Sequence, residues 1–259
     1  MERLARLRIV KTGMNAGKFA RFLLGLFAFL TLFSCTTRIG GPLNADGSAV
    51  MSVSVSLEPK MTALIQKLFT AGGVSLAGGG SAAGISILDG PAISASMSNA
   101  PGIASVLLKN TAPAAIEGPV RISKISDFLT YGAGGGFITF EQGRSGGRCK
   151  ININRENGPE ILPLLSPEIV DYLSAIMAPI ATGEDLGKAE YLAIVSSVYN
   201  KAISDEISGS KIRASIDFPG VIYGIKGGTF TGKRAEFDIP LIDLLVLETP
   251  LIYEVEWKQ

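Results

Sequence analysis

The chain has 259 residues, of which 47% are hydrophobic, and its 24 basic and 23 acidic side chains nearly cancel. Nucleic-acid binding needs a basic stripe, which this charge balance does not provide, so we expect no nucleic-acid partner. The chain has no histidine, the side chain that most often transfers protons near neutral pH and most often ligates metals. Carboxylate pairs, a serine–lysine dyad or a calcium site on oxygen ligands need no histidine, but no motif indicates one. We therefore expect no enzyme, no metal site and no cofactor.

The N-terminal segment has the order of residues that export requires. Basic residues precede an uncharged apolar run over residues 22–33, which is too short to cross a bilayer as a helix but suits a signal peptide. Leu32 and Ser34 then lead into Cys35 in the spacing of a lipobox, with an aliphatic residue, a small residue and the cysteine that receives the acyl chains. We predict a signal peptide over residues 1–34 and lipidation of Cys35.

An acylated Cys35 places the chain in the cell envelope, with the membrane as its partner. Several acyl chains hold a protein at a bilayer far better than one chain does. We expect residues 35–45 to be a short tether and residues 46–259 to form the globular domain, with no further membrane-spanning segment. The sequence offers two starts, Met1 and Met14, and indicates neither an inner nor an outer membrane.

The first part of the predicted domain alternates and then turns helical. An Asp-Gly pair at 46–47 is typical of a hairpin turn, and apolar residues alternate with serines over 51–57, which predicts a strand with one buried face. Apolar residues at helical spacing over 61–69 predict an amphipathic helix that packs on this hairpin. Residues 72–90 are rich in Gly, Ala and Ser, and this composition predicts a flexible segment.

The rest of the chain is predicted from the same periodicities. The expected elements are a short helix at 91–99, strands and turns over 102–156, helices at 167–177 and from about 184 to 207, strands at 212–218, 221–226 and 229–239, a short helix at 241–247, and a last strand with Tyr253, Val255 and Trp257 on one face. We predict an α+β fold, with one or more antiparallel sheets and segregated amphipathic helices behind the signal peptide.

Two local motifs have a chemical and a structural interpretation. Residues 227–233 read GGTFTGK and match a phosphate-binding loop up to Arg234, where a Ser or Thr would hold magnesium. A strand pattern follows where such a loop would open a helix, so we interpret the segment as a turn between strands. Cys149 lies in an alternating run, which favours a small buried side chain over a reactive thiol.

Three segments, at 165–186, 190–199 and 237–257, carry a resemblance that covers the chain from about residue 122 to 258. It is to a group of spirochaetal lipoproteins of uncharacterised function. The opening strand, the Asp-Gly turn, the first helix and the closing strand that ends in Trp257 are similar in pattern to the LppM-like lipoproteins. This second resemblance implies an α+β domain with a hydrophobic pocket that accommodates lipid.

Three functional classes follow. The first is an envelope lipoprotein that binds a lipid or another apolar ligand between its sheet and a helix. The candidate lining residues are Met61, Leu173 and Met177. The two methionines are chosen because a flexible thioether adapts to a ligand of irregular shape. The second is a structural or protein-interaction lipoprotein without a ligand pocket. The third is an enzyme without a known signature. An enclosed apolar cavity favours the first, an exposed apolar patch the second, and converging carboxylates the third.

Overall fold

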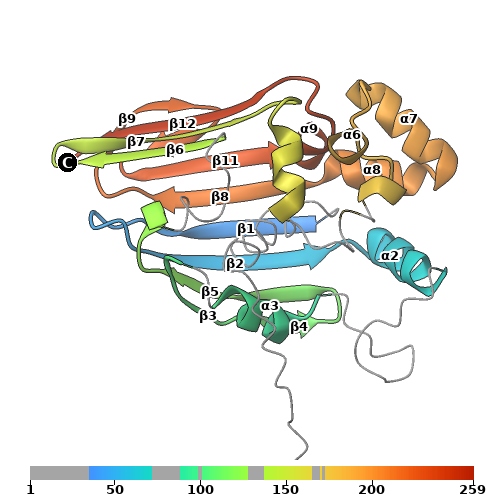
Figure 1. Cartoon of the computed structure of the whole chain (residues 1–259), viewed down its shortest axis with the longest axis horizontal. Coiled ribbons are helices and arrows are strands. Elements are labelled where there is room, and N and C mark those ends of the chain that lie inside the picture. The colour runs from blue at the N-terminus through green and yellow to red at the C-terminus, as the bar shows by residue number, and fades with distance from the viewer. Residues whose placement is uncertain (1–34, 72–87, 99–100, 128–136, 165–169, 171–172) are drawn as a thin grey trace, which may run out of the picture.

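The computed structural model describes residues 35–71, 88–98, 101–127, 137–164, 170 and 173–259 (Figure 1). The predicted signal peptide and most of the predicted flexible segment at 72–90 lie outside these residues. The described part is an α+β fold built on two sheets, as the sequence predicts.

The larger sheet has the strand order β10-β11-β8-β1-β2-β5-β3, and β4 also pairs with β5. Its strands are β1 Cys35–Pro42, β2 Ala49–Leu57, β3 Ile103–Val106, β4 Lys109–Ala112, β5 Ala115–Ile122, β8 Lys211–Asp217, β10 Thr229–Thr231 and β11 Arg234–Pro240. All neighbours are antiparallel except β1 and β8, which are parallel. The expected antiparallel pairing is thus confirmed, with one parallel pair that the sequence does not predict.

The smaller sheet is antiparallel and has the order β6-β7-β12-β9. Its strands are β6 Ile138–Gly143, β7 Gly146–Ile153, β9 Val221–Lys226 and β12 Leu251–Lys258. β9 and β10 follow one another in the chain and lie in different sheets, so the short connection at Gly227 and Gly228 joins the sheets along one side.

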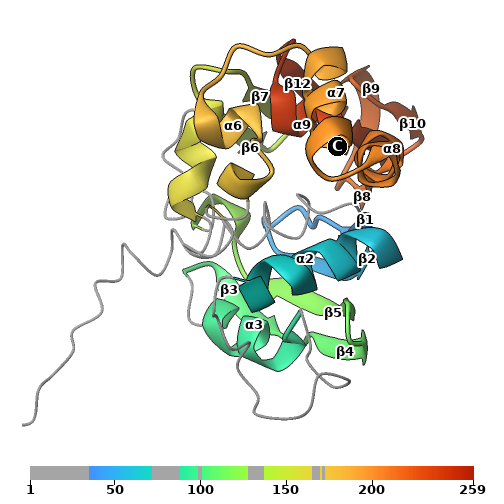
Figure 2. The same cartoon turned by 90° about the vertical axis from the view of Figure 1, so that its right-hand side faces the viewer.

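Most helices gather at one end of the sheets (Figures 1 and 2), and the C-terminus lies at the opposite end (Figure 1). The helices at that end are α2 Pro59–Ala71, α6 Pro179–Thr182, α7 Lys188–Val198, α8 Lys201–Gly209 and α9 Leu241–Val246. The helix α3, Gly90–Met97, lies over β3 and β4, and Gly158–Leu164 is a 3-10 helix. The predicted segregation of helices from strands is confirmed.

Side chains of the two sheets pack together in a core around Trp257. Its side chain is 1% exposed, and its ring centroid lies 4.8 Å from that of Phe218 and 6.0 Å from that of Phe140. A Cβ atom on Gly147 would lie 2.3 Å from Cζ2 of Trp257, so only glycine fits beneath the indole ring. The predicted buried face of the last strand is confirmed by Val255, which is 2% exposed, as well as by Trp257.

The predicted helix from about 184 to 207 is in fact two helices, α7 and α8. Asn200 breaks it, because its side chain accepts a hydrogen bond from the backbone N–H of Ile203 at 3.1 Å and begins α8 as an N-cap. Ser204 donates to the carbonyl of Leu192 at 2.9 Å and holds the two helices together. The apolar period of a single helix would place Val198 towards the core, but at the end of α7 it is 56% exposed.

The predicted strand at 229–239 is a hairpin of two strands. β10 and β11 are joined by a turn at Gly232, whose φ is 62°, a left-handed conformation that glycine adopts without strain. The segment 227–233 therefore opens no helix, as predicted, but it is more than a turn, because it contains the strand β10.

Candidate functional site

Cys35, the predicted lipidation site, is the first residue of β1. In backbone register it lies opposite Leu57 of β2, and Thr36 lies opposite Lys211 of β8. β1 is therefore a central strand of the larger sheet, which corrects the tether predicted over residues 35–45. Its sequence CTTRIGGP contains only one large apolar residue, Ile39, but Thr37 is 0% exposed and β1 pairs with β2 and with the distant β8.

The start of β1 lies at the helical end of the molecule (Figure 1). α2 begins at Pro59, two residues beyond the partner of Cys35, and α8 ends at Gly209, just before Lys211. The residue predicted to carry the lipid therefore lies beside the ends of α2 and α8.

The candidate ligand-lining residues lie at the same end. Met61 is 1% exposed and Leu173 is 0% exposed, and both belong to one core cluster beneath the helices. Met177 is half-buried and lies in the turn after Ala175, where its φ is 53°. The helix predicted at 167–177 lies only in part within the described residues, where Leu173 to Ala175 are helical. The role of Met61, Leu173 and Met177 in ligand binding stays a prediction.

A carboxylate from a distant part of the chain caps α2. Oxygens of Glu206 in α8 accept hydrogen bonds from the backbone N–H groups of Met61 at 2.9 Å and Lys60 at 3.3 Å. These are N–H groups that a helix leaves unpaired in its first turn, where negative charge is favourable. Asp205, the neighbour of Glu206, instead forms an exposed ion pair with Lys201.

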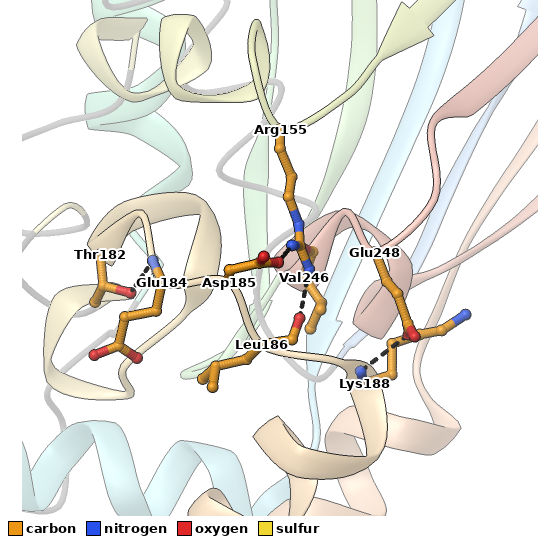
Figure 3. A network of polar contacts seen from close by, with 8 residues as sticks. All are labelled: Arg155, Thr182, Glu184, Asp185, Leu186, Lys188, Val246 and Glu248. Atoms are coloured by element: carbon orange, nitrogen blue, oxygen red, sulfur yellow. Dashed lines mark hydrogen bonds and ion pairs between the residues drawn. The ribbon is translucent and has the colours of Figure 1, made fainter.

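A second carboxylate, Glu248, caps α7 in the same way. The N-cap position is Gly187, which has no side chain, and Glu248 accepts from the backbone N–H of Lys188 at 3.0 Å (Figure 3). The ammonium group of Lys188 donates to Asp243 at 2.9 Å, and this bond raises the pKa of Lys188. The start of α7 is therefore bound to Asp243 in α9 and to Glu248, two residues beyond the end of α9.

Arg155 joins three segments near these caps (Figure 3). It donates to the carbonyl of Leu186 at 2.5 Å and to that of Val246 at 3.4 Å, and it forms an ion pair with Asp185. The carbonyl of Val246 lies in the last turn of α9, where a cation is favourable. Asp185 lies in the loop before α7, which begins three residues later, at Lys188. The network fixes the loop between α6 and α7 in place.

We compared two hollows in the described part of the structure with the predicted ligand site. The first has about 550 Å³, is open, and lies on the smaller sheet, where Glu141, Arg148, Tyr223, Glu256 and Lys258 contribute to its lining. Arg148 donates to Glu254 at 2.7 Å, so its charge is already paired. The second has about 50 Å³ and lies beside Arg155. Neither is lined by a residue predicted to contact an apolar ligand.

Tyr191 in α7 has a buried hydroxyl group with no hydrogen-bond partner among the described residues. Its side chain is 0% exposed, and this burial raises the pKa of the phenol. An unpaired buried hydroxyl costs free energy, so Tyr191→Phe is expected to leave the free energy of unfolding unchanged or to raise it by about 1 kcal/mol. Urea titration at neutral pH measures this change.

The pH dependence of the Tyr191→Phe variant provides a second check. Because folding raises the pKa of Tyr191, the unfolded chain ionises first, near the ordinary value of 10.0, and the wild type loses stability as the pH rises above it. The phenylalanine variant should lose less over the same range. A variant that is destabilised by more than about 1 kcal/mol at neutral pH would show that the hydroxyl group has a partner.

Cys149 in β7 packs against the core around Trp257. Burial raises the pKa of its thiol to about 11, so the thiol is protonated near neutral pH and is a poor nucleophile. This environment supports the structural interpretation of Cys149. The described residues contain no cluster of side chains suited to hold a metal ion. They also contain no helix with the length and apolar character needed to span a bilayer.

No protein-family model matches the chain, and no curated protein matches it. Among solved structures, it is similar to the folded domain of the LppM protein of Mycobacterium tuberculosis, determined by NMR. The match covers 87% of this chain and 90% of that chain, with 8% sequence identity and a TM-score of 0.38. A likeness of this size carries no functional conclusion, so both resemblances seen in the sequence stay predictions.

Proposed function

We propose that the chain is a cell-envelope lipoprotein, cut between Ser34 and Cys35, acylated on Cys35 and held at a membrane surface by that lipid. The observation that carries the proposal is the position of the lipobox directly after the apolar run at 22–33. The cut would leave β1 whole, because this strand begins at Cys35. The lipid would thus join the domain without a spacer.

The proposed role is interaction through the surface of the domain, without catalysis. The absence of histidine from the whole chain supports a role other than the commonest proton-transfer chemistry. The burial of Met61 and Leu173 supports a packed core in the place where the sequence predicts a pocket for an apolar ligand. The competing proposal, a lipid-binding pocket at that place, is tested in the Discussion.

Acylation is tested by metabolic labelling with a fatty-acid analogue in an expression host that processes lipoproteins. The wild type should incorporate the label, and Cys35→Ala should lose it entirely and keep its signal peptide, because the thiol is the acceptor and its diacylation precedes the cut. Cys149→Ala is the matched control, since it removes the other cysteine and should label like the wild type. Label that remains in Cys35→Ala would refute the proposed function.

A further inference from the structure

Four exposed basic side chains lie near the start of β1. Lys211 is the register neighbour of Thr36, and Arg213 lies opposite Arg38, on the same two strands. Lys60 is the second residue of α2, which begins beside the partner strand of Cys35. All four are exposed, with 47% of the Lys211 side chain and 55% of the Arg213 side chain accessible.

The distance of these side chains from the lipid follows from the strand geometry. A strand rises about 3.3 Å per residue, so the backbone of Arg38 lies roughly 10 Å beyond that of Cys35. The Debye length, the range over which a charged surface acts on an exposed charge, is about 10 Å at 0.1 M salt and about 8 Å at physiological salt. Lys211, opposite Thr36, lies within that range of Cys35, and Arg38 and Arg213 lie at its limit.

Three carboxylates lie near this group, those of Asp238, Glu206 and Glu58, the last of which directly follows the partner of Cys35, so the four basic side chains exceed the acidic ones by one. The carboxylate of Asp238 in β11 lies 3.8 Å from Nζ of Lys211 and 3.5 Å from Nε of Arg213, so one negative charge is shared between two positive ones. Arg38 forms no ion pair with any residue that the structure describes, and its neighbour across the strand is Ser54. The carboxylate of Glu206, which is also near, is bound to the N-terminus of α2.

We propose that the start of β1 and β8 is turned towards the bilayer, so that the phosphate groups of anionic phospholipids attract Arg38, Lys60, Lys211 and Arg213. This inference rests on the proposed acylation of Cys35, because the lipid sets which end faces the membrane. The occupant of this surface is the lipid headgroup layer. Each basic side chain near an anionic surface strengthens binding about fivefold, so four of them orient the domain beyond what the lipid anchor alone imposes.

The orientation is tested on the acylated protein, reconstituted in phosphatidylcholine vesicles with and without about one third phosphatidylglycerol. Lysines are acetylated briefly and each site is quantified by mass spectrometry. Lys60 and Lys211 should react about fivefold more slowly on the anionic vesicles, and high salt should abolish the difference because it screens the attraction. The internal controls are the exposed Lys233 and Lys258, which lie at the opposite end of the strands and should react equally on both.

A paired variant separates the charge effect from simple proximity. Arg38→Gln combined with Arg213→Gln should reduce the protection of Lys60 and Lys211 at least twofold. Arg121→Gln is the matched control, because Arg121 is also exposed on this sheet but lies opposite Val50, near the other end of β2.

Two different failures can be told apart. Protein that does not float with either kind of vesicle is not acylated, and the proposed function fails. Protein that floats but shows equal reactivity of all four lysines on both vesicles is acylated, and the inferred orientation alone is overturned.

Discussion

Trp257→Ala is expected to lower the free energy of unfolding by about 3–5 kcal/mol, the range for removal of a buried aromatic side chain. The indole ring is 1% exposed and packs between side chains of both sheets, so its loss leaves a cavity that the surrounding strands cannot easily fill. Its ring nitrogen has no hydrogen-bond partner among the described residues, so the expected loss is one of packing. The change should be measured by urea denaturation followed by circular dichroism.

Phe230→Ala is the control for this experiment. Phe230 is an aromatic residue of β10 that is 41% exposed, and its replacement should cost less than about 1 kcal/mol. Similar losses for the two variants would mean that the two sheets do not pack around Trp257 as described. A large loss for Trp257 alone would support this core.

Elements with a regular local pattern could be predicted from the sequence. β2 alternates apolar residues with serines, and the structure buries Met51, Val53, Val55 and Leu57 as that period requires. The short helix at 241–247 and the buried face of β12 were also predicted, because each has an apolar pattern that its neighbours in the sequence suffice to define.

Elements that depend on distant partners could not be predicted. β1 has a sequence that suits a tether, and it is a strand because β2 and β8 bind both of its edges. The caps of α2 and α7 come from Glu206 and Glu248, which follow the capped residues by 145 and 60 positions. The break at Asn200 has a local signal, since Asn is a strong N-cap residue, but the apolar period continues across it.

The candidate site divides in the same way. Cys35 is indicated by a local motif, because the enzymes of export recognise a short stretch of unfolded chain. The neighbours that this cysteine acquires are not local: Lys211 lies beside Thr36 only because β8 pairs with β1 in parallel. The set of basic side chains that we propose to face the membrane therefore cannot be predicted from the sequence, because the strand register brings its members together.

Leu173→Ala distinguishes a packed core from a ligand pocket beneath the helices. If Leu173 packs closed, as its exposure of 0% indicates, the substitution should lower the free energy of unfolding by about 2–5 kcal/mol. A residue that lines a pocket touches fewer protein atoms, and its truncation in the empty protein should cost less than about 1 kcal/mol. Thermal or urea denaturation of the wild type and the variant measures the difference.

The matched control is Leu107→Ala, which removes the same atoms from a side chain that is 62% exposed and should change stability by less than about 0.5 kcal/mol. Lipid content is the second measurement: organic extraction of the purified protein should release no lipid, because the chains on Cys35 are covalently attached and stay with the protein. A small loss of stability in Leu173→Ala, together with extracted lipid that the variant binds less well, would establish the ligand-binding role of Met61, Leu173 and Met177. A large loss of stability in Leu173→Ala, together with an extract that contains no lipid, would support the proposed role of interaction through the surface of the domain.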